Sequence, residues 1–159
     1  MKKIIILIIL TSLIGCHQKI EPIDNQNQQK TTQEEKIDKK GDEEVMDLYI
    51  NNHKYDVKLL QNETADSLLE RLPLTVTMDE LHGNEKYIYL EQSLPSHSQK
   101  IFSIHTGDIM LFNNNCLVLF YEDFQTDYQY TPIGKITNAQ NLKEDLGKGN
   151  VQVIFQKER

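Results

Sequence analysis

Residues 104–136 read IHTGDIMLFNNNCLVLFYEDFQTDYQYTPIGKI and contain the strongest strand signals in the chain. It holds two near-continuous apolar runs, 109–112 and 116–121, which are separated only by three asparagines. Short apolar runs bounded by turn-forming residues are typical of buried strands, because they are too short to be independent helices. The stretch therefore predicts a central β-hairpin, followed by an aromatic loop that closes at Gly134.

Further strands are expected on both sides of this hairpin. Residues 46–50 and 55–59 alternate in polarity, and Asn51 and Asn52 between them tolerate a positive φ, so they predict a second hairpin. Alternation also predicts strands at 74–78, 86–90 and 151–155. In the strand at 86–90 two tyrosines share one face and two aliphatic residues the other, which predicts that both faces are covered or that one lines a pocket.

Two short helices complete the predicted elements. Residues 65–72 place apolar side chains at helical spacing, and Asn62 or Thr64 can cap the first turn. Residues 139–146 show a weaker version of the same pattern, which ends at Gly147. About eight strands and two helices without βαβ alternation predict a mainly β fold, a closed antiparallel barrel.

The first residues resemble a bacterial lipoprotein signal peptide. Lys2 and Lys3 precede the apolar run 4–10, and Leu13-Ile14-Gly15-Cys16 resembles the lipobox, whose cysteine is acylated. The apolar run is shorter than a comfortable membrane span, so we expect a leader at 1–15 and lipidation at Cys16. The alternative is an ordinary signal peptide with an incidental cysteine.

The next segment, to residue 44, differs in composition from the remainder. It is rich in glutamine, lysine and glutamate and has no aromatic residue, so it cannot bury enough apolar surface to offset its conformational entropy. We expect residues 16–44 to be a lipidated, disordered tether and 45–159 to be the folded domain. A partner-binding tail is the alternative, but the segment has no hydrophobic anchors to support it.

Several segments of the expected domain resemble the bacterial cyclophilin-like domain family: 83–87, 93–95, 107–111, 117–121, 128–136 and 149–151. The resemblance spans 46–156 in consistent order. It implies a small cyclophilin-like barrel with two helices over its ends. It does not imply isomerase activity, because these small bacterial domains have no settled biochemical role.

Prolyl isomerase activity is disfavoured by the missing arginine. Cyclophilins with this activity carry the arginine within a Phe-His-Arg segment, which does not occur in this chain. The two arginines, Arg71 and Arg159, lie at the end of a predicted helix and at the last residue. Lysine lacks the planar fork of donors that the role needs. A divergent isomerase remains the enzymatic alternative.

Composition and spacing argue against other chemistry. Residues 45–159 carry ten Lys and Arg against sixteen Asp and Glu, a balance that disfavours nucleic acid. The histidines show no metal-ligand spacing, so no metal or cofactor is expected. Cys116 lies in an apolar strand, where cysteine usually behaves as a small hydrophobe, and no catalytic residue is assigned.

Seven of the twelve aromatic residues fall on one strand and on one strand with its loop: Tyr87, Tyr89, Phe120, Tyr121, Phe124, Tyr128 and Tyr130. They are either core packing or a concave aromatic site. For the second case we expect a small molecule or extended peptide to contact Tyr87, Phe120, Tyr128 and Tyr130. The sequence thus predicts an extracytoplasmic, membrane-anchored lipoprotein that acts as a binding module, with an envelope assembly partner as the other alternative.

Overall fold

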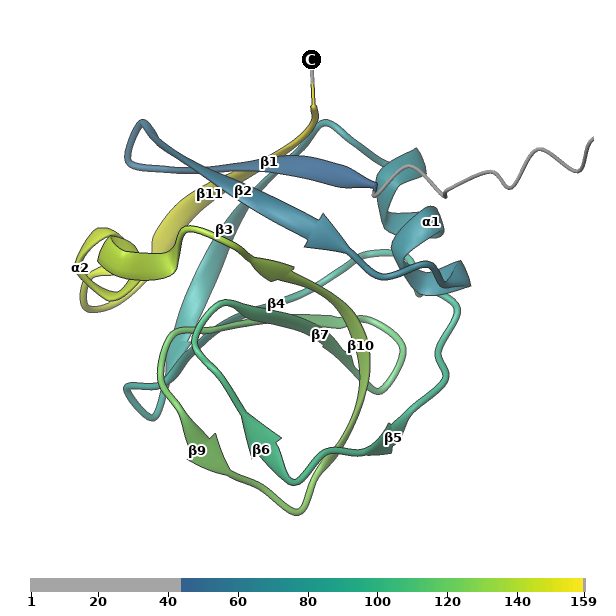
Figure 1. Cartoon of the computed structure of the whole chain (residues 1–159). Coiled ribbons are helices and arrows are strands. Elements are labelled where there is room, and N and C mark those ends of the chain that lie inside the picture. Colours follow the sequence, from purple (N-terminus) through teal and green to yellow (C-terminus); the bar gives the residue numbers. More distant parts are fainter. Residues whose placement is uncertain (1–43, 159) are drawn as a thin grey trace, which may run out of the picture. The chain divides into compact units, whose positions relative to one another are not determined.

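The computed structural model describes residues 44–158. The predicted leader, Cys16 and, up to residue 43, the predicted tether lie outside these residues. The described elements follow one another as β1 (Val45–Ile50), β2 (His53–Leu59), α1 (Glu63–Glu70), β3 (Leu74–Leu81), β4 (Glu85–Tyr89), β5 (Gln99–Lys100), β6 (Ser103–Ile104), β7 (Asp108–Phe112), β8 (Cys116–Phe120), β9 (Phe124–Gln125), β10 (Gln129–Ile136), a 3-10 turn (Ala139–Asn141), α2 (Leu142–Leu146) and β11 (Val151–Lys157) (Figure 1).

Eight of the strands within 44–158 form a closed antiparallel barrel in the order β2-β1-β11-β3-β4-β8-β7-β10, and a pairing between β10 and β2 closes the ring. The short strand β5 pairs with the first residues of β10. Strands β6 and β9 pair in a small separate sheet. The predicted mainly β barrel with two short helices is confirmed.

Both predicted hairpins are present. Strands β1 and β2 pair from Val45 to Ile50, and the connecting Asn51 and Asn52 have φ angles of 48° and 68°. Two successive positive φ values make a turn whose twist matches that of the strands, and asparagine tolerates them better than most residues. Strands β7 and β8 form the central hairpin around the three asparagines.

The prediction of an aromatic loop up to Gly134 is wrong in its C-terminal part, because residues 129–136 form strand β10. This strand pairs with β7, and the register shifts between Pro132 and Gly134. A proline and a glycine close together normally interrupt a strand, but a bulge accommodates both. The loop between β8 and β10 is therefore shorter than expected and contains β9.

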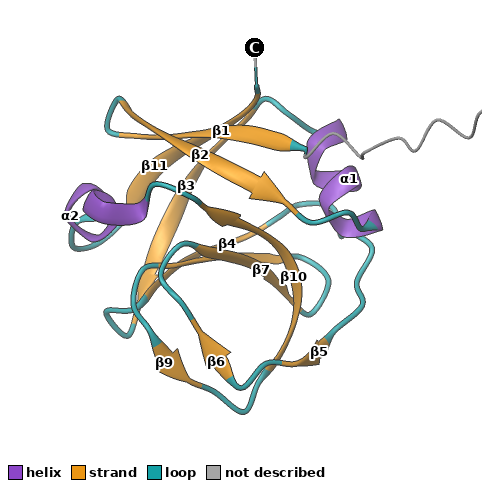
Figure 2. Cartoon of the chain, in the orientation of Figure 1, coloured by secondary structure: helices purple, strands orange, loops and turns teal. Residues whose placement is uncertain are grey.

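The helices lie at opposite ends of the β1–β2 hairpin (Figure 2). Asn62 caps α1, its side-chain oxygen accepting a hydrogen bond of 2.9 Å from the Ala65 amide. The second predicted helix is one 3-10 turn followed by one α-helical turn, which ends at Gly147 with φ 57°. Within residues 44–158 neither helix is long and apolar enough to cross a membrane.

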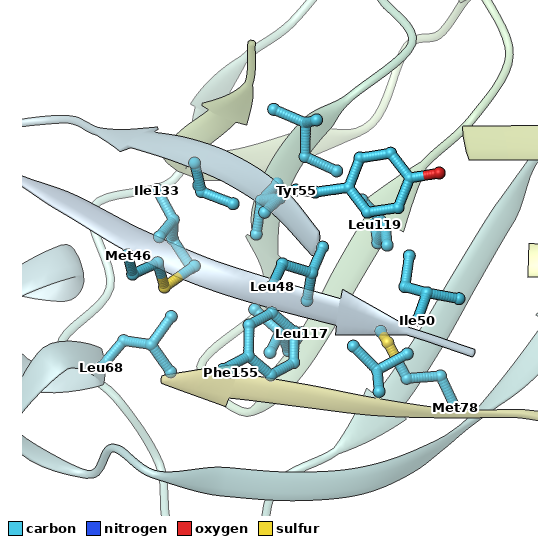
Figure 3. Packing of buried hydrophobic residues seen from close by; sticks show 14 of the residues in the cluster. Met46, Leu48, Ile50, Tyr55, Leu68, Met78, Leu117, Leu119, Ile133 and Phe155 are labelled. Atoms are coloured by element: carbon cyan, nitrogen blue, oxygen red, sulfur yellow. The ribbon is translucent and has the colours of Figure 1, made fainter. Parts of the chain in front are cut away.

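The barrel core is built from the inward faces of the strands and from α1. Inward side chains of β1 meet those of β8, β11 and β3, and Leu68 of α1 covers one end (Figure 3). The labelled residues include Met46, Leu48, Ile50, Met78, Leu117, Leu119 and Phe155, all fully buried. Burial of a side chain of this size contributes roughly 1.5–3 kcal/mol, so this cluster is the main source of stability.

One charged side chain is buried with the core. Lys86 of β4 is fully buried, and its ammonium donates to Glu80 and to the carbonyls of Gly147 and Gly149, at 3.0 and 2.5 Å. Glu80 also accepts a hydrogen bond from the Tyr121 hydroxyl. Although burial opposes it, the hydrogen bonds from Lys86 and Tyr121 lower the pKa of Glu80, which keeps the buried ammonium paired.

Closure of the barrel depends on a close approach of backbones at Gly134. This residue lies opposite Leu59 of β2 on one side and Ile109 of β7 on the other. A Cβ at this position would lie 2.7 Å from the Lys58 carbonyl oxygen, closer than van der Waals contact permits. Glycine is therefore required here for space rather than for an unusual φ.

We expect Gly134→Ala to reduce the free energy of unfolding by about 3 kcal/mol, because the added methyl group overpacks the seam between β10 and β2. Urea unfolding followed by circular dichroism measures the effect. Gly83→Ala is the control, since a Cβ there meets nothing within 4 Å and only its φ of 74° is unfavourable, at a cost of about 1 kcal/mol. Equal losses for the two variants would contradict the close-contact explanation.

Candidate functional site

A cavity of about 830 Å³ lies on the outer side of the barrel wall, over strands β4, β7 and β8. Outward residues of these strands line it, together with Tyr130 of β10, the β3–β4 turn and residues 124–128. The cavity is large enough for a drug-sized organic molecule.

The wall beneath the cavity is apolar on both faces. On β7 and β8, Leu111 and Leu117 face the barrel core, whereas Met110 and Val118 belong to a second apolar cluster on the outer face. This arrangement explains why the sequence of both strands is almost continuously apolar, since strands covered on both faces show no alternation. Three members of the second cluster, Cys116, Val118 and Tyr130, reach the lining of the cavity.

Strand β4 supplies three cavity residues by simple alternation. Glu85, Tyr87 and Tyr89 line the cavity, while Lys86 and Ile88 between them are directed to the core side. Tyr87 and Tyr89 pack edge to face, with ring centroids 5.8 Å apart. The expected division of this strand into a tyrosine face and an aliphatic face is present in the structure.

The segment that borders the cavity opposite β4 is fixed at its base. The carboxylate of Asp123 accepts hydrogen bonds from the amide and hydroxyl of Thr106, at 2.6 and 2.8 Å. These bonds lower the pKa of Asp123. Phe124 then packs on Phe120 with centroids 5.7 Å apart.

The structure brings three of the four expected site residues to this cavity. Tyr87, Tyr128 and Tyr130 line it, but Phe120 is fully buried beneath Phe124 and Tyr130 and does not reach it. Tyr128 of the loop and Tyr130 of β10 differ in role. Tyr128 is 65% exposed at the rim, whereas Tyr130 is 5% exposed and packs against Phe112 and Phe120 with centroid distances of 5.5 Å.

Other lining residues were not assigned to the site from the sequence. Tyr89 and Glu85 share the face of Tyr87, so the period-2 pattern of β4 contained this signal. Phe112 and Cys116 enter the lining because they face each other across the central hairpin. Nothing in the sequence indicated that the outer face of this hairpin would be hollow.

Glu85 is the carboxylate on the cavity wall. Burial among the aromatic side chains raises its pKa to about 7, and the nearby negative charge of Glu80 adds to the effect. Cys116 lies opposite Tyr89, and burial together with the Glu85 charge raises the pKa of its thiol to about 11. A thiol with this pKa is a poor nucleophile at neutral pH.

The other groups considered for chemistry lie away from the cavity or apart from each other. Arg71 is the C-cap residue of α1, and its guanidinium donates hydrogen bonds to the carbonyls of Gln92 and Ser93, at 2.8 and 2.7 Å. Among residues 44–158, no three His, Cys, Asp or Glu side chains are grouped as metal ligands would be. Arg159 and Cys16 lie outside the described residues.

A family described as cyclophilin-like matches residues 48–156. Among solved structures, the solution structure of a hypothetical protein from Archaeoglobus fulgidus is similar, with a TM-score of 0.53 and 17% sequence identity. The similarity covers 77% of this chain and all of that one, and at this identity it shows a shared fold only. No curated protein matches the chain.

We expect Glu85→Gln to stabilise the protein at alkaline but not at acidic pH. A carboxyl whose folded pKa exceeds its ordinary value of 4.5 favours the folded state only while protonated, so its contribution is lost as the pH rises from about 4.5 through 7. Solvent in the open cavity screens the charge, so we expect about 1 kcal/mol at pH 8, or roughly 4 °C in Tm.

Thermal unfolding of the wild type and Glu85→Gln at pH 4 and pH 8 measures this difference. Glu70→Gln, which removes an exposed carboxylate of α1, is the matched control and should leave Tm unchanged at both pH values. An equal Tm shift of Glu85→Gln at the two pH values would show that the Glu85 carboxylate is not destabilised by its surroundings.

Proposed function

Since the chain belongs to the cyclophilin-like family, we propose that its barrel is a binding domain that holds a small organic molecule or an extended peptide. The observation that carries this proposal is the cavity of about 830 Å³ on the outer face of β4, β7 and β8. Its walls combine aromatic rings with polar side chains from the β3–β4 turn, from Glu85 and from residues 125–127, and a mixture of apolar area and polar groups is expected of a ligand site.

Binding is better supported than catalysis by the groups at the cavity. A nucleophile needs an adjacent base or a lowered pKa, and the Cys116 thiol has a raised one. Arg71 is the arginine of the described residues that could take the role of an isomerase arginine, but its guanidinium already donates hydrogen bonds to two backbone carbonyls. Neither group offers the chemistry that an acyl-transfer or prolyl-isomerase reaction requires.

The same proposal includes the location of the protein. The leader-like sequence and the lipobox-like Leu13-Ile14-Gly15-Cys16 support a lipoprotein held on the extracytoplasmic side of the cell membrane by acyl chains on Cys16. The glutamine-rich segment would then act as a tether between this anchor and the barrel. An anchored binding domain retains its ligand near the cell surface.

We expect the full chain, purified under non-denaturing conditions, to carry a molecule that mass spectrometry detects after denaturation. Tyr89→Ala and Tyr128→Ala should reduce its occupancy about tenfold, because each removes a ring from the rim of the cavity. Both tyrosines are mostly exposed, so the stability of the variants should change by less than about 0.5 kcal/mol.

Phe102→Ala is the matched control, since Phe102 is 62% exposed and does not line the cavity. An equal loss of the molecule in this variant would place binding elsewhere. A co-purifying protein would instead favour an assembly role, and turnover of a prolyl peptide would favour the enzyme.

We also expect Cys16→Ser to release the protein from the membrane fraction, because serine lacks the thiol that is acylated. Metabolic labelling with a radioactive fatty acid, followed by cell fractionation, measures both effects. Cys116→Ser is the control, since that thiol is buried and should not be labelled. Continued labelling of the Cys16→Ser variant would contradict a lipid anchor at this residue.

A further inference from the structure

The charges around the cavity have one predominant sign. Glu85 lies on its wall and Asp127 at its rim, and no lysine or arginine is among the residues that line it within 44–158. The adjacent Lys86 points to the opposite face and is engaged by Glu80. Lys100, 3.8 Å from Asp127, is exposed and outside the lining.

Aromatic rings line the same cavity as Glu85. Tyr87 is its neighbour on the same face of β4, and Tyr130 approaches from β10. Tyr128, at the rim, packs edge to face on Phe112, with ring centroids 5.9 Å apart. The faces of such rings carry negative partial charge and attract cations, most strongly where water is excluded.

We propose that the cavity binds an organic cation, an amine or a quaternary ammonium group, whose positive charge lies against Glu85 and among the tyrosine rings. This inference rests on the proposed binding function and names the chemical class of its ligand. A bare metal ion fits poorly, because aromatic rings supply no hard oxygen ligands and no cluster of metal-binding side chains is found in residues 44–158.

Binding of a cation and protonation of Glu85 compete. Because burial holds the pKa of Glu85 near 7, part of the carboxyl is neutral at physiological pH, and a bound cation favours the ionised form. Affinity should therefore rise as the pH is raised from about 5.5 to 8.5. An anion would show no such gain.

The expected pH dependence can be attributed to Glu85 only if the neighbouring ionisable groups do not change charge in the same pH range. Glu80 of β3 stays ionised through its bond with Lys86, and Cys116 of β8 and Tyr130 of β10 have raised pKa values, so none of them titrates between pH 5.5 and 8.5. Asp127 and His82 are the other ionisable side chains among the lining residues. A positive charge on the His82 imidazole would also oppose a bound cation.

The test compares three probes that share a phenyl ring: benzyltrimethylammonium, benzyl alcohol and benzenesulfonate. Isothermal titration calorimetry of the full chain at pH 8 should give millimolar or tighter binding of the ammonium probe, weaker binding of the alcohol and none of the sulfonate. Glu85→Gln should weaken the ammonium probe at least about tenfold and leave the alcohol unchanged.

Two further variants test whether Glu85 is the group that causes the pH dependence of ammonium binding. Glu70→Gln removes an equal charge outside the cavity and should not change the affinity for the ammonium probe. His82→Asn removes the imidazole that lines the cavity, and asparagine tolerates the φ of 52° at this position. The rise of affinity with pH should persist in His82→Asn and disappear in Glu85→Gln.

Equal affinity for the three probes, or an ammonium affinity unchanged by Glu85→Gln, would overturn the cation proposal and leave a less selective cavity. Absence of ammonium binding would overturn it as well. The proposed binding function fails separately, when the wild type carries no molecule or when Tyr128→Ala retains it as well as the wild type does. A neutral co-purified molecule would support the function and refute the cation.

Discussion

The contact between β10 and β2 at Gly134 is the constraint on which the remaining structure depends. Without it the sheet would have two free edges, and the curvature of the wall formed by β4, β8, β7 and β10 would not be fixed. The cavity lies on the outside of this wall. A backbone approach that only glycine allows in the seam therefore also sets the shape of the candidate site.

One wall serves both the core and the site. Side chains of β7 and β8 alternate between the barrel interior and the outer face, where the cavity lies, and on β4 the neighbours Glu85 and Lys86 place opposite charges on opposite faces. Lys86 is neutralised by Glu80 on the core side, whereas Glu85 has no cation among the cavity-lining residues of the described chain. The two faces thus have different electrostatic roles within one strand.

Much of the fold could be predicted from the sequence because its signals are local. The asparagine pair at 51–52, the central hairpin and the Asn62 cap each act over a few residues. Strand β10 was missed because Pro132 and Gly134 normally interrupt strands, and only the bulge, a tertiary feature, reconciles them with pairing. For the site, period-2 spacing identifies the face of Tyr87, but whether that face is hollow or filled depends on how residues 124–128 cross it, as the burial of Phe120 shows.

The position of β11 has a consequence for how the chain acquires its structure. This last strand lies between β1 and β3, although both are made long before it. A chain that emerges from its N-terminus can form local hairpins early, but β1 and β3 keep unpaired edges until Val151–Lys157 arrives. The barrel therefore cannot close before Val151–Lys157 has been made, and these two edges need protection from other chains until then.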